Sequence, residues 1–140
     1  CVGAVAMNAA PSAEYAREQQ PATPKIAIVD APSEYISSHG KVIAANDQDV
    51  SARILSMGTM HHAFTGTGTI ATGVAASIPG TVISQMLSQL LSPDKQLKIA
   101  HPGGVIEVSA EVSFEHGLWV AQRASIIRTA RTLMKGMVYF

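Results

Sequence analysis

The chain has 140 residues, of which 47% are hydrophobic and 14% are charged, so it is long and apolar enough for one folded domain and is not a disordered chain. Ten basic and ten acidic residues cancel, which argues against a protein that binds nucleic acid or an anionic membrane. A single cysteine excludes an internal disulfide framework, and no uninterrupted apolar stretch is long enough to span a membrane, so we expect a cytoplasmic protein with some apolar surface against another domain or chain.

The first third of the chain predicts one helix and two strands. Ser12 can cap a helix from residue 13 to residue 20, with Glu14 in its first turn, where the helix dipole favours an anion. Two prolines then end that helix. The β-branched apolar run at residues 25–29 predicts a buried strand, and residues 42–44 predict a shorter one.

A second helix is predicted at residues 46–58. Asn46 and Asp47 resemble an N-terminal cap, and Gly58 stands where a helix would stop. The apolar residues expected on one side of this helix are Val50, Ile54, Leu55 and Met57.

Two further helices are expected in the middle of the chain. Residues 69–77 are small and apolar on most sides, which is typical of a helix surrounded by protein. Pro79 and Gly80 break this helix, and Thr81 can cap the next one. The apolar face of that next helix consists of Val82, Met86, Leu87 and Leu90.

From residue 97 onward the hydrophobic pattern changes to a period near two, which predicts strands. The predicted strands are residues 97–99, 105–112, 118–127 and 137–140. The segments between the first three contain glycine, proline and histidine, which suit turns.

The most informative segment is the Thr-Gly-Thr-Gly turn ahead of the helix expected at residues 69–77. Gly66 and Gly68 let backbone amides approach a ligand closely, and the first turn of a helix leaves several N–H groups without intrahelical partners. Such a helix end binds anions, of which carboxylates are the obvious small ones. The hydroxyl donors at the same place are Thr65, Thr67 and Thr69.

Two other interpretations of this turn are open. Thr67 can simply cap the helix while the glycines form the turn, and the local pattern does not separate this from a ligand site. Gly66, Gly68 and Ala71 fit a loose dinucleotide-binding spacing, but no good strand precedes them and no acidic residue follows about twenty positions later. A Walker lysine is missing as well, so nucleotide phosphates are disfavoured.

The residues around this turn resemble those of a known superfamily. Residues 64–69, Phe-Thr-Gly-Thr-Gly-Thr, resemble the Cys-Gly-Thr-Gly turn that opens the second central helix of diaminopimelate epimerases. Thr65 stands at the position of their catalytic cysteine. Residues 102–108 and 130–136 resemble the Gly-Gly hairpin and the closing strand of that superfamily.

The chain is more similar to the PrpF-like branch, which includes methylaconitate and aconitate isomerases, methylitaconate isomerase and oxalomesaconate tautomerase. The motifs that carry this similarity are Thr23-Pro-Lys25, residues 53–58 with His61, residues 78–81, His101-Pro102 and residues 128–131. They occur in the order of the family and together cover most of the chain, which makes the set far more specific than any single motif.

The resemblance implies an α+β fold of the diaminopimelate-epimerase type, in which a mixed β-sheet is rolled around a central helix that begins near Thr67. It implies that residues 1–140 are the C-terminal domain of a two-domain isomerase, whose N-terminal domain is absent from this chain. Such isomerases move a carbon–carbon double bond by an allylic proton shift, without a cofactor. Their substrates are small tri- or dicarboxylates such as methylaconitate, aconitate, methylitaconate or oxalomesaconate.

The resemblance also places the general acid and base, a lysine and a cysteine, in the N-terminal domain, so no catalytic residue is assigned in this chain. The substrate-binding residues expected here are His61, Thr65, Gly66, Thr67 and Gly68. Thr65 is a poor base because a hydroxyl does not ionise near neutrality, and it suits a hydrogen-bond donor. The expected partners are the small carboxylate, the N-terminal domain and a second copy in a homodimer; no metal, cofactor, nucleic acid or membrane is expected.

Two alternatives to this function remain open from the sequence. The chain can be a module that binds carboxylates or forms a dimer without catalysing a reaction. Alternatively, Cys1 can be the N-terminal nucleophile of a hydrolase subunit, although no neighbouring residue resembles one that would support a nucleophile.

Several other polar side chains are ambiguous. His61 and His62 point to opposite sides of an extended stretch, so only one of them can face a metal. His101, before a proline, suits packing of a turn better than catalysis. Three arginines can either clamp a carboxylate or form ion pairs, namely Arg53, Arg128 and Arg131. Lys25 can point into the cleft, and the sequence does not decide its role. Glu107 and Glu111 share a face of a predicted strand, where a solvated sheet face is favoured over a working carboxylate pair.

Overall fold

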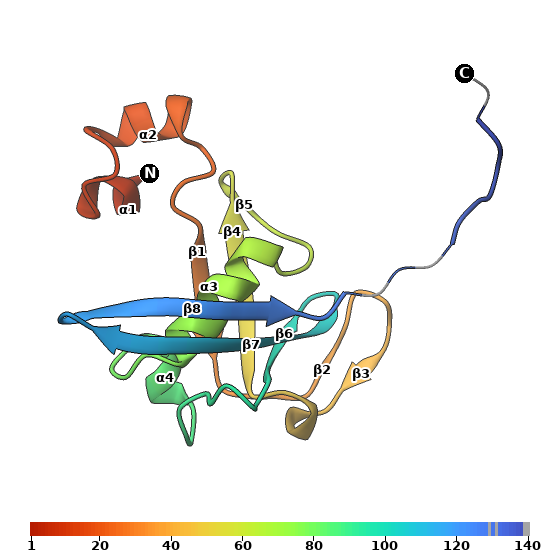
Figure 1. Cartoon of the computed structure of the whole chain (residues 1–140). Helices are drawn as coiled ribbons and strands as arrows, with labels where there is room; N and C mark the ends of the chain where they lie inside the picture. Colours follow the sequence, from red (N-terminus) through yellow and green to blue (C-terminus); the bar gives the residue numbers. More distant parts are fainter. Residues whose placement is uncertain (129, 131, 139–140) are drawn as a thin grey trace.

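The computed structural model describes residues 1–128, 130 and 132–138. It has an α+β fold in which a curled mixed sheet of six strands surrounds helix α3, which confirms the predicted α+β class and the mixed sheet around a helix (Figure 1). The helices are α1 (Val2–Ala6), α2 (Ala13–Gln19), the short 3-10 helix η1 (Ala45–Asp47), α3 (Gly66–Ala76) and α4 (Val82–Met86). The strands are β1 (Ile26–Asp30), β2 (Tyr35–Ile36), β3 (Val42–Ile43), β4 (Val50–Ser56), β5 (Thr59–Met60), β6 (Leu97–His101), β7 (Gly104–Glu115) and β8 (Leu118–Ile126).

The large sheet has the strand order β1-β4-β6-β7-β8, with the short β5 paired to β4. Strands β4 and β6 run parallel, and the other pairs are antiparallel. Strands β1 and β8 therefore form the two edges of the sheet. Strands β2 and β3 make a separate small sheet, which is tied to the large one by the Tyr35 hydroxyl, 2.7 Å from the carbonyl oxygen of His101 and 2.8 Å from that of Gly104.

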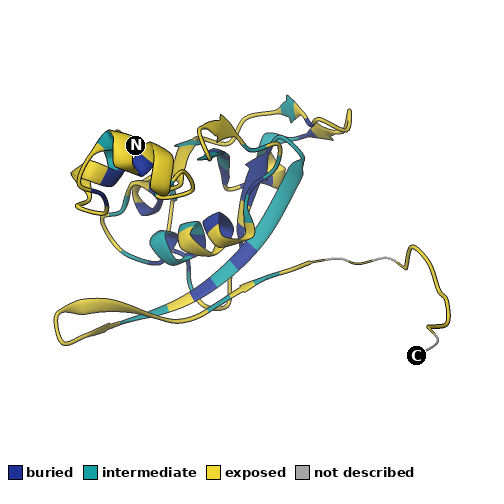
Figure 2. Cartoon of the chain, turned by 90° about the horizontal axis from the view of Figure 1, so that it is seen from above, coloured by how far each residue is buried: buried dark blue, intermediate teal, exposed yellow. Residues whose placement is uncertain are grey.

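Helix α3 lies in the hollow of the sheet, chiefly against β7 and β8 (Figures 1 and 2). Its backbone comes very close to two strands because Gly68 and Gly73 have no side chain. A Cβ atom on Gly73 would lie 2.6 Å from a methyl group of Val108, and one on Gly68 would overlap the Ile54 side chain. The main core consists of Val50, Ala52, Ile54, Phe64, Ala76, Ile83, Leu91, Leu97, Ile99 and Val108.

The prediction of a helix at residues 46–58 is wrong. After the single 3-10 turn η1, this segment forms β4, one of the inner strands of the sheet. Val50, Ala52 and Ile54 are buried and alternate with half-buried residues, which is the period of a strand. The spacing of four between Val50 and Ile54 fits both a helix and a strand, and the burial of alternate residues against α3 decides for the strand.

The glycine expected to end that helix forms a turn instead. Met57 and Gly58 have φ angles of 54° and 79° and are the two central residues of the β4–β5 hairpin. Two positive φ values are what a tight turn between antiparallel strands requires, so Gly58 serves the hairpin rather than a helix end.

The strand expected at residues 25–29 is confirmed as β1, but its predicted burial is wrong. Four of the five β1 residues are exposed. The strand lies at the edge of the sheet, and Ile26 and Ile28 alternate with Ala27 and Val29, which line the space beside α3. Ile26 and Ile28 therefore point to the other face of the sheet, where both remain exposed. Apolar content alone does not separate an inner strand from an edge strand.

The two ends of the chain differ from expectation in different ways. The helix expected from residue 13 is confirmed as α2, with Ser12 as its cap, and the short α1 before it was not predicted. The strand expected at residues 137–140 lies partly outside the described residues, and Met137 and Val138 are not in a strand. Among the helices that the structure describes, none has the length and hydropathy that a membrane crossing needs.

Candidate functional site

The first turn of α3 has two backbone amides that the protein itself does not use. Thr65 is the N-cap: its side-chain oxygen accepts a hydrogen bond from the N–H of Gly68 at 3.1 Å. Its carbonyl oxygen accepts from the N–H of Thr69 at 2.8 Å. Within the described part of the chain, the N–H groups of Gly66 and Thr67 have no acceptor, and both residues are exposed. These two donors, with the positive end of the helix dipole, suit a small anion.

The two glycines of this turn have different roles. Gly68 is buried, and the space of its missing side chain is bordered by Ile54 and by the Thr65 hydroxyl oxygen, 2.7 Å from an added Cβ. Gly66 is exposed, and an added Cβ would have only the ordinary contact of 3.8 Å with Ile126. Gly68 therefore serves the packing of the helix, whereas Gly66 and Thr67 are the residues that a ligand can reach.

His61 lies in the loop that leads into α3. Its backbone N–H donates to the carbonyl oxygen of Ile54 at 2.9 Å, and its Nδ1 accepts from the N–H of Ala63 at 3.1 Å. The ring stacks on His62 with centroids 4.6 Å apart, so the expectation that the two histidines point to opposite sides is wrong. Because Nδ1 is the acceptor, the neutral ring carries its proton on Nε2, and the residue as a whole is half-exposed.

His101 is the last residue of β6, beside this loop, and its ring also accepts a hydrogen bond from a backbone N–H. Its Nδ1 accepts from the N–H of Gly103 at 3.1 Å, which is the turn packing expected from the sequence. Burial lowers the pKa of His101, and the coulombic interactions with Arg53, His61 and His62 lower it further. A Cβ on Gly103 would lie 3.8 Å from Ala63, so the two histidine-bearing loops are neighbours. The lowered pKa favours the neutral form of the His101 ring.

Arg53 does not join the open amides. It lies between the inward-facing Ala52 and Ile54 on β4, so its side chain leaves from the other face of the sheet. There its guanidinium lies over the ring of Tyr35, with the carbon 5.6 Å from the ring centroid, and donates to the carbonyl oxygen of Ala52 at 2.8 Å. Burial is also the main cause that raises the pKa of Tyr35.

The remaining candidates are scattered. Arg128 is exposed beyond the end of β8, and Arg131 lies outside the described residues. Glu107 and Glu111 share a face of β7 and stand opposite Lys98 and Arg123 on the neighbouring strands. Over the residues that the structure describes, no group of three or more His, Cys, Asp or Glu side chains is placed to hold a metal ion.

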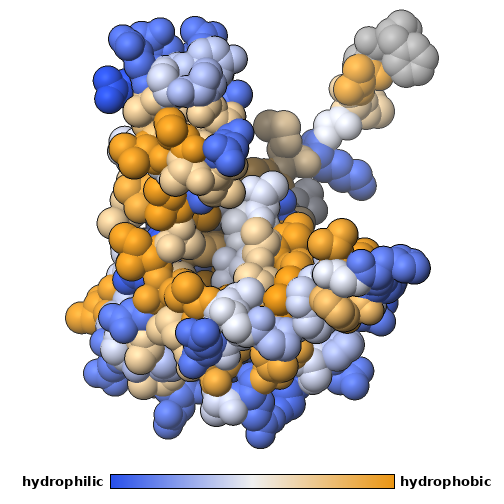
Figure 3. All heavy atoms as spheres, turned by 90° about the vertical axis from the view of Figure 1, so that its left-hand side faces the viewer, coloured by the Kyte–Doolittle hydropathy of each residue, from blue (hydrophilic) through white to orange (hydrophobic). Residues whose placement is uncertain are grey.

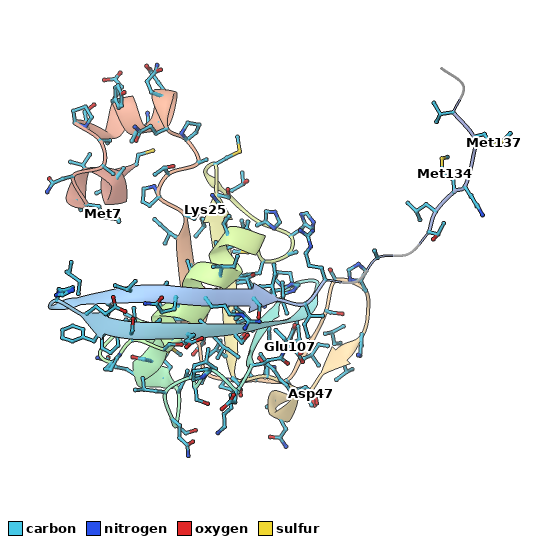
Figure 4. All side chains as sticks on the ribbon, in the orientation of Figure 1. Met7, Lys25, Asp47, Glu107, Met134 and Met137 are labelled. Carbon is cyan, nitrogen blue, oxygen red and sulfur yellow. The ribbon has the colours of Figure 1, made fainter. Side chains whose placement is uncertain are left out.

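A groove of about 330 Å³ runs between β1 and α3 and reaches the first turn of the helix. Among the described residues that line it, Lys25 is the one with a charge, and it stands at the start of β1 (Figure 4). The structure thus turns Lys25 toward a cleft, a position that the sequence leaves undecided. The other lining residues are Ala27, Val29, Ile54, Gly68, Ala71, Thr72, Ala75, Thr81, Val82 and Ile83.

A second cavity, of about 460 Å³, lies under the segment that joins α4 to β6. Gln48 lines it, and the side-chain oxygen of Gln48 has no hydrogen-bond partner within the described residues. That oxygen is sealed from solvent, so a ligand in the cavity would not reach it. The cavity lies away from the open amides, and we assign it no role.

Comparison with known proteins gives the context of this site. The model of the family described as PrpF protein matches residues 1–140. The chain is 44% identical over 116 residues to 2-methyl-aconitate isomerase of Shewanella oneidensis, which covers 83% of the chain and 29% of that protein. It is 39% identical over 138 residues to the 2-methyl-aconitate isomerase of Cupriavidus necator, covering 99% of the chain and 34% of that protein.

Two further similarities involve methylitaconate. The chain is 38% identical over 136 residues to 3-methylitaconate isomerase of Eubacterium barkeri, which covers 96% of the chain and 34% of that protein. A crystal structure of methylitaconate-delta-isomerase superposes with a TM-score of 0.73 at 33% identity, covering 91% of this chain and 33% of that one. The chain therefore spans about a third of the length of the relatives it matches.

Proposed function

Because this chain belongs to the PrpF family, whose model it matches from residue 1 to residue 140, we propose that it is part of an isomerase that moves a carbon–carbon double bond in a small di- or tricarboxylate. The relatives' names point to methylaconitate and methylitaconate as the substrate class. In such a substrate, a proton leaves one end of an allylic system and another is added at the other end. The reaction needs no cofactor.

The observation that carries this proposal is the pair of open amides at Gly66 and Thr67. Removal of an allylic proton next to a carboxylate spreads negative charge onto that carboxylate. Fixed N–H donors at a helix end stabilise this charge without reorganising, which is the electrostatic contribution that proton abstraction requires. We assign this binding and stabilising role to Thr65, Gly66 and Thr67, with the half-exposed His61 as a further donor.

We place the acid and the base outside the 140 residues. The cap and first turn of α3 carry no ionisable side chain, and the Thr65 hydroxyl does not ionise near neutrality and already caps the helix. In this proposal the curled sheet around α3 is the second of two domains of the diaminopimelate-epimerase type. The first domain would supply the lysine and the cysteine across the cleft. A cytoplasmic location and a homodimer remain predictions.

The second candidate is a carboxylate-binding or dimerisation module without catalysis, which the lack of an ionisable side chain among the residues of the α3 first turn favours. The hydrolase alternative has less support. Cys1 is exposed at the start of α1, and no described side chain is hydrogen-bonded to its thiol.

A chimera tests the proposal. The 140-residue chain replaces the matching region of the Shewanella isomerase, and methylaconitate is followed by proton NMR in heavy water. The chimera is expected to exchange the allylic proton and shift the double bond, and the 140-residue chain alone is expected to do neither. Full-rate isomerisation by the chain alone would contradict the division of roles, and a folded chimera that exchanges no proton would contradict the isomerase itself.

A further inference from the structure

The groove between β1 and α3 results from small side chains on both of its walls. Ala27 on β1 and Ala71 and Ala75 on α3 leave space that larger residues would fill. On the other side of the same helix the space is occupied, because Gly73 meets Val108 directly. At about 330 Å³ the groove has the size of a pocket for a small organic ligand.

The groove is lined mostly by apolar side chains and carries one positive charge among its described lining residues. Apart from Lys25 and the hydroxyls of Thr72 and Thr81, its walls are apolar. In the part of the chain that the structure describes, no acidic side chain lines the groove, and Lys25 supplies its one positive charge. Apolar side chains also dominate much of the surface below the polar N-terminal helices (Figure 3). A ligand that fits must therefore combine a hydrocarbon part with negative charge.

The position of the groove relates it to the open amides. Gly68 lines the groove and belongs to the first turn of α3. Gly66 lies two residues earlier, which is about 3 Å along the helix axis. One bound molecule of a few carbon atoms can therefore reach both the helix end and the groove.

We propose that this groove holds the hydrocarbon part of the substrate and that Lys25 binds a second carboxylate, so that the chain selects ligands with two or more carboxylates. This inference rests on the proposed function, because it assigns one carboxylate to the open amides. Lys25 acts as a point charge at the rim, and the alanines of the groove set how much hydrocarbon fits. The substrate class that follows is an apolar chain of a few carbons with carboxylates at separate positions.

Titrations of the 140-residue chain test the role of Lys25. The ligands are tricarballylate, a saturated tricarboxylate that cannot isomerise, and butyrate, a monocarboxylate. Their binding is followed by the chemical shifts of the backbone amides of the chain. Lys25→Met is expected to weaken tricarballylate binding about tenfold, the size of one charge-assisted hydrogen bond, and to leave butyrate binding unchanged. Lys25→Arg is expected to restore binding. The control is Lys41→Met, an exposed lysine next to β3 that lies outside the groove.

A second variant tests the hydrocarbon part. Ala71 is exposed, so Ala71→Leu is expected to fold normally and to fill the groove. It should weaken the binding of both tricarballylate and butyrate, because the hydrocarbon part of either ligand would lie in the groove. If the unaltered chain binds tricarballylate and both Lys25→Met and Ala71→Leu bind it equally well, the groove assignment is overturned. If the unaltered chain and the chimera bind neither ligand, the proposed function itself is overturned.

Discussion

The small residues of helix α3 occupy two kinds of position, which we call packed and open. At the packed positions, Gly73 meets Val108, and Gly68 meets Ile54, so each glycine is required by a neighbour inside the chain. At the open positions, Gly66 and Ala71 are exposed, and an added Cβ on Gly66 would make only an ordinary contact. Small residues that no internal packing explains mark a surface that a ligand or another domain approaches closely.

The same comparison applies to the backbone amides of the first turn. The N–H of Gly68, at a packed position, is satisfied by the Thr65 side chain. The exposed N–H groups of Gly66 and Thr67 have no acceptor within the described residues. The helix thus uses its own cap for one donor and leaves two donors open, which the proposed function assigns to a ligand.

The largest expected effect is the loss of stability when Gly73, at a packed position, is replaced. Gly73→Ala places a Cβ 2.6 Å from a methyl group of Val108, and we expect the free energy of unfolding to fall by about 2–3 kcal/mol. Chemical denaturation measures this loss. Because the cause is one contact, Val108→Ala should reduce the cost of the glycine substitution. An equal cost in both backgrounds would contradict the packing argument.

The next largest effect is the loss of carboxylate binding when Gly66, at an open position, is replaced. Gly66→Pro removes one open N–H at the first helical position, where proline is well tolerated, and Thr65 already has the extended conformation that a following proline requires. We expect carboxylate binding to weaken about tenfold, or about 1.4 kcal/mol, while the free energy of unfolding changes by less than about 0.5 kcal/mol. Calorimetric titration and thermal melting measure the two quantities. A variant that binds as well as the unaltered chain would show that this amide is not used.

Removal of the Thr65 cap should have a smaller effect on stability. Thr65→Val keeps the shape but removes the oxygen that accepts from Gly68, so it is expected to cost about 1 kcal/mol of stability. Thr65→Ser retains the oxygen and is the matched control, with little expected loss. Equal losses in both variants would mean that the capping bond does not contribute.

The smallest effect is a pH dependence at the neighbouring loop. The pKa of His101 lies below its ordinary value of 6.5, so the unfolded chain takes up a proton more readily than the folded chain does. Stability should therefore fall as the pH drops below 6.5, until the folded pKa is passed. In His101→Asn, which keeps an acceptor for the Gly103 N–H, the drop in melting temperature between about pH 7.5 and about pH 5.5 should be smaller. An unchanged drop would contradict this assignment.

Much of the architecture could be predicted from the sequence, because local patterns determine it. The helix behind the glycine turn, its small residues, the Ser12 cap and the late strands follow from periodicity and capping chemistry. The family similarity based on short ordered motifs is confirmed by the match over residues 1–140. The start of α3 was expected near Thr67, and the helix begins at Gly66 with Thr65 as its cap.

The remaining features depend on contacts between distant parts of the chain. Residues 46–58 fit a helix in sequence, and only the burial of alternate residues against α3 makes the segment a strand. The different roles of Gly66 and Gly68 depend on Ile54, which lies more than ten residues away in the sequence. The face of the sheet on which the Arg53 side chain lies follows from the same strand pairing. The assignment of substrate-binding residues stays a prediction.

The most direct test of the central claim is a titration of the isotope-labelled chain with tricarballylate, read at each backbone amide. The account predicts that the signals of Gly66 and Thr67 shift most and saturate together, while that of Gly68, already bonded to Thr65, moves less. Saturable binding that leaves Gly66 and Thr67 unshifted and moves amides elsewhere would contradict it.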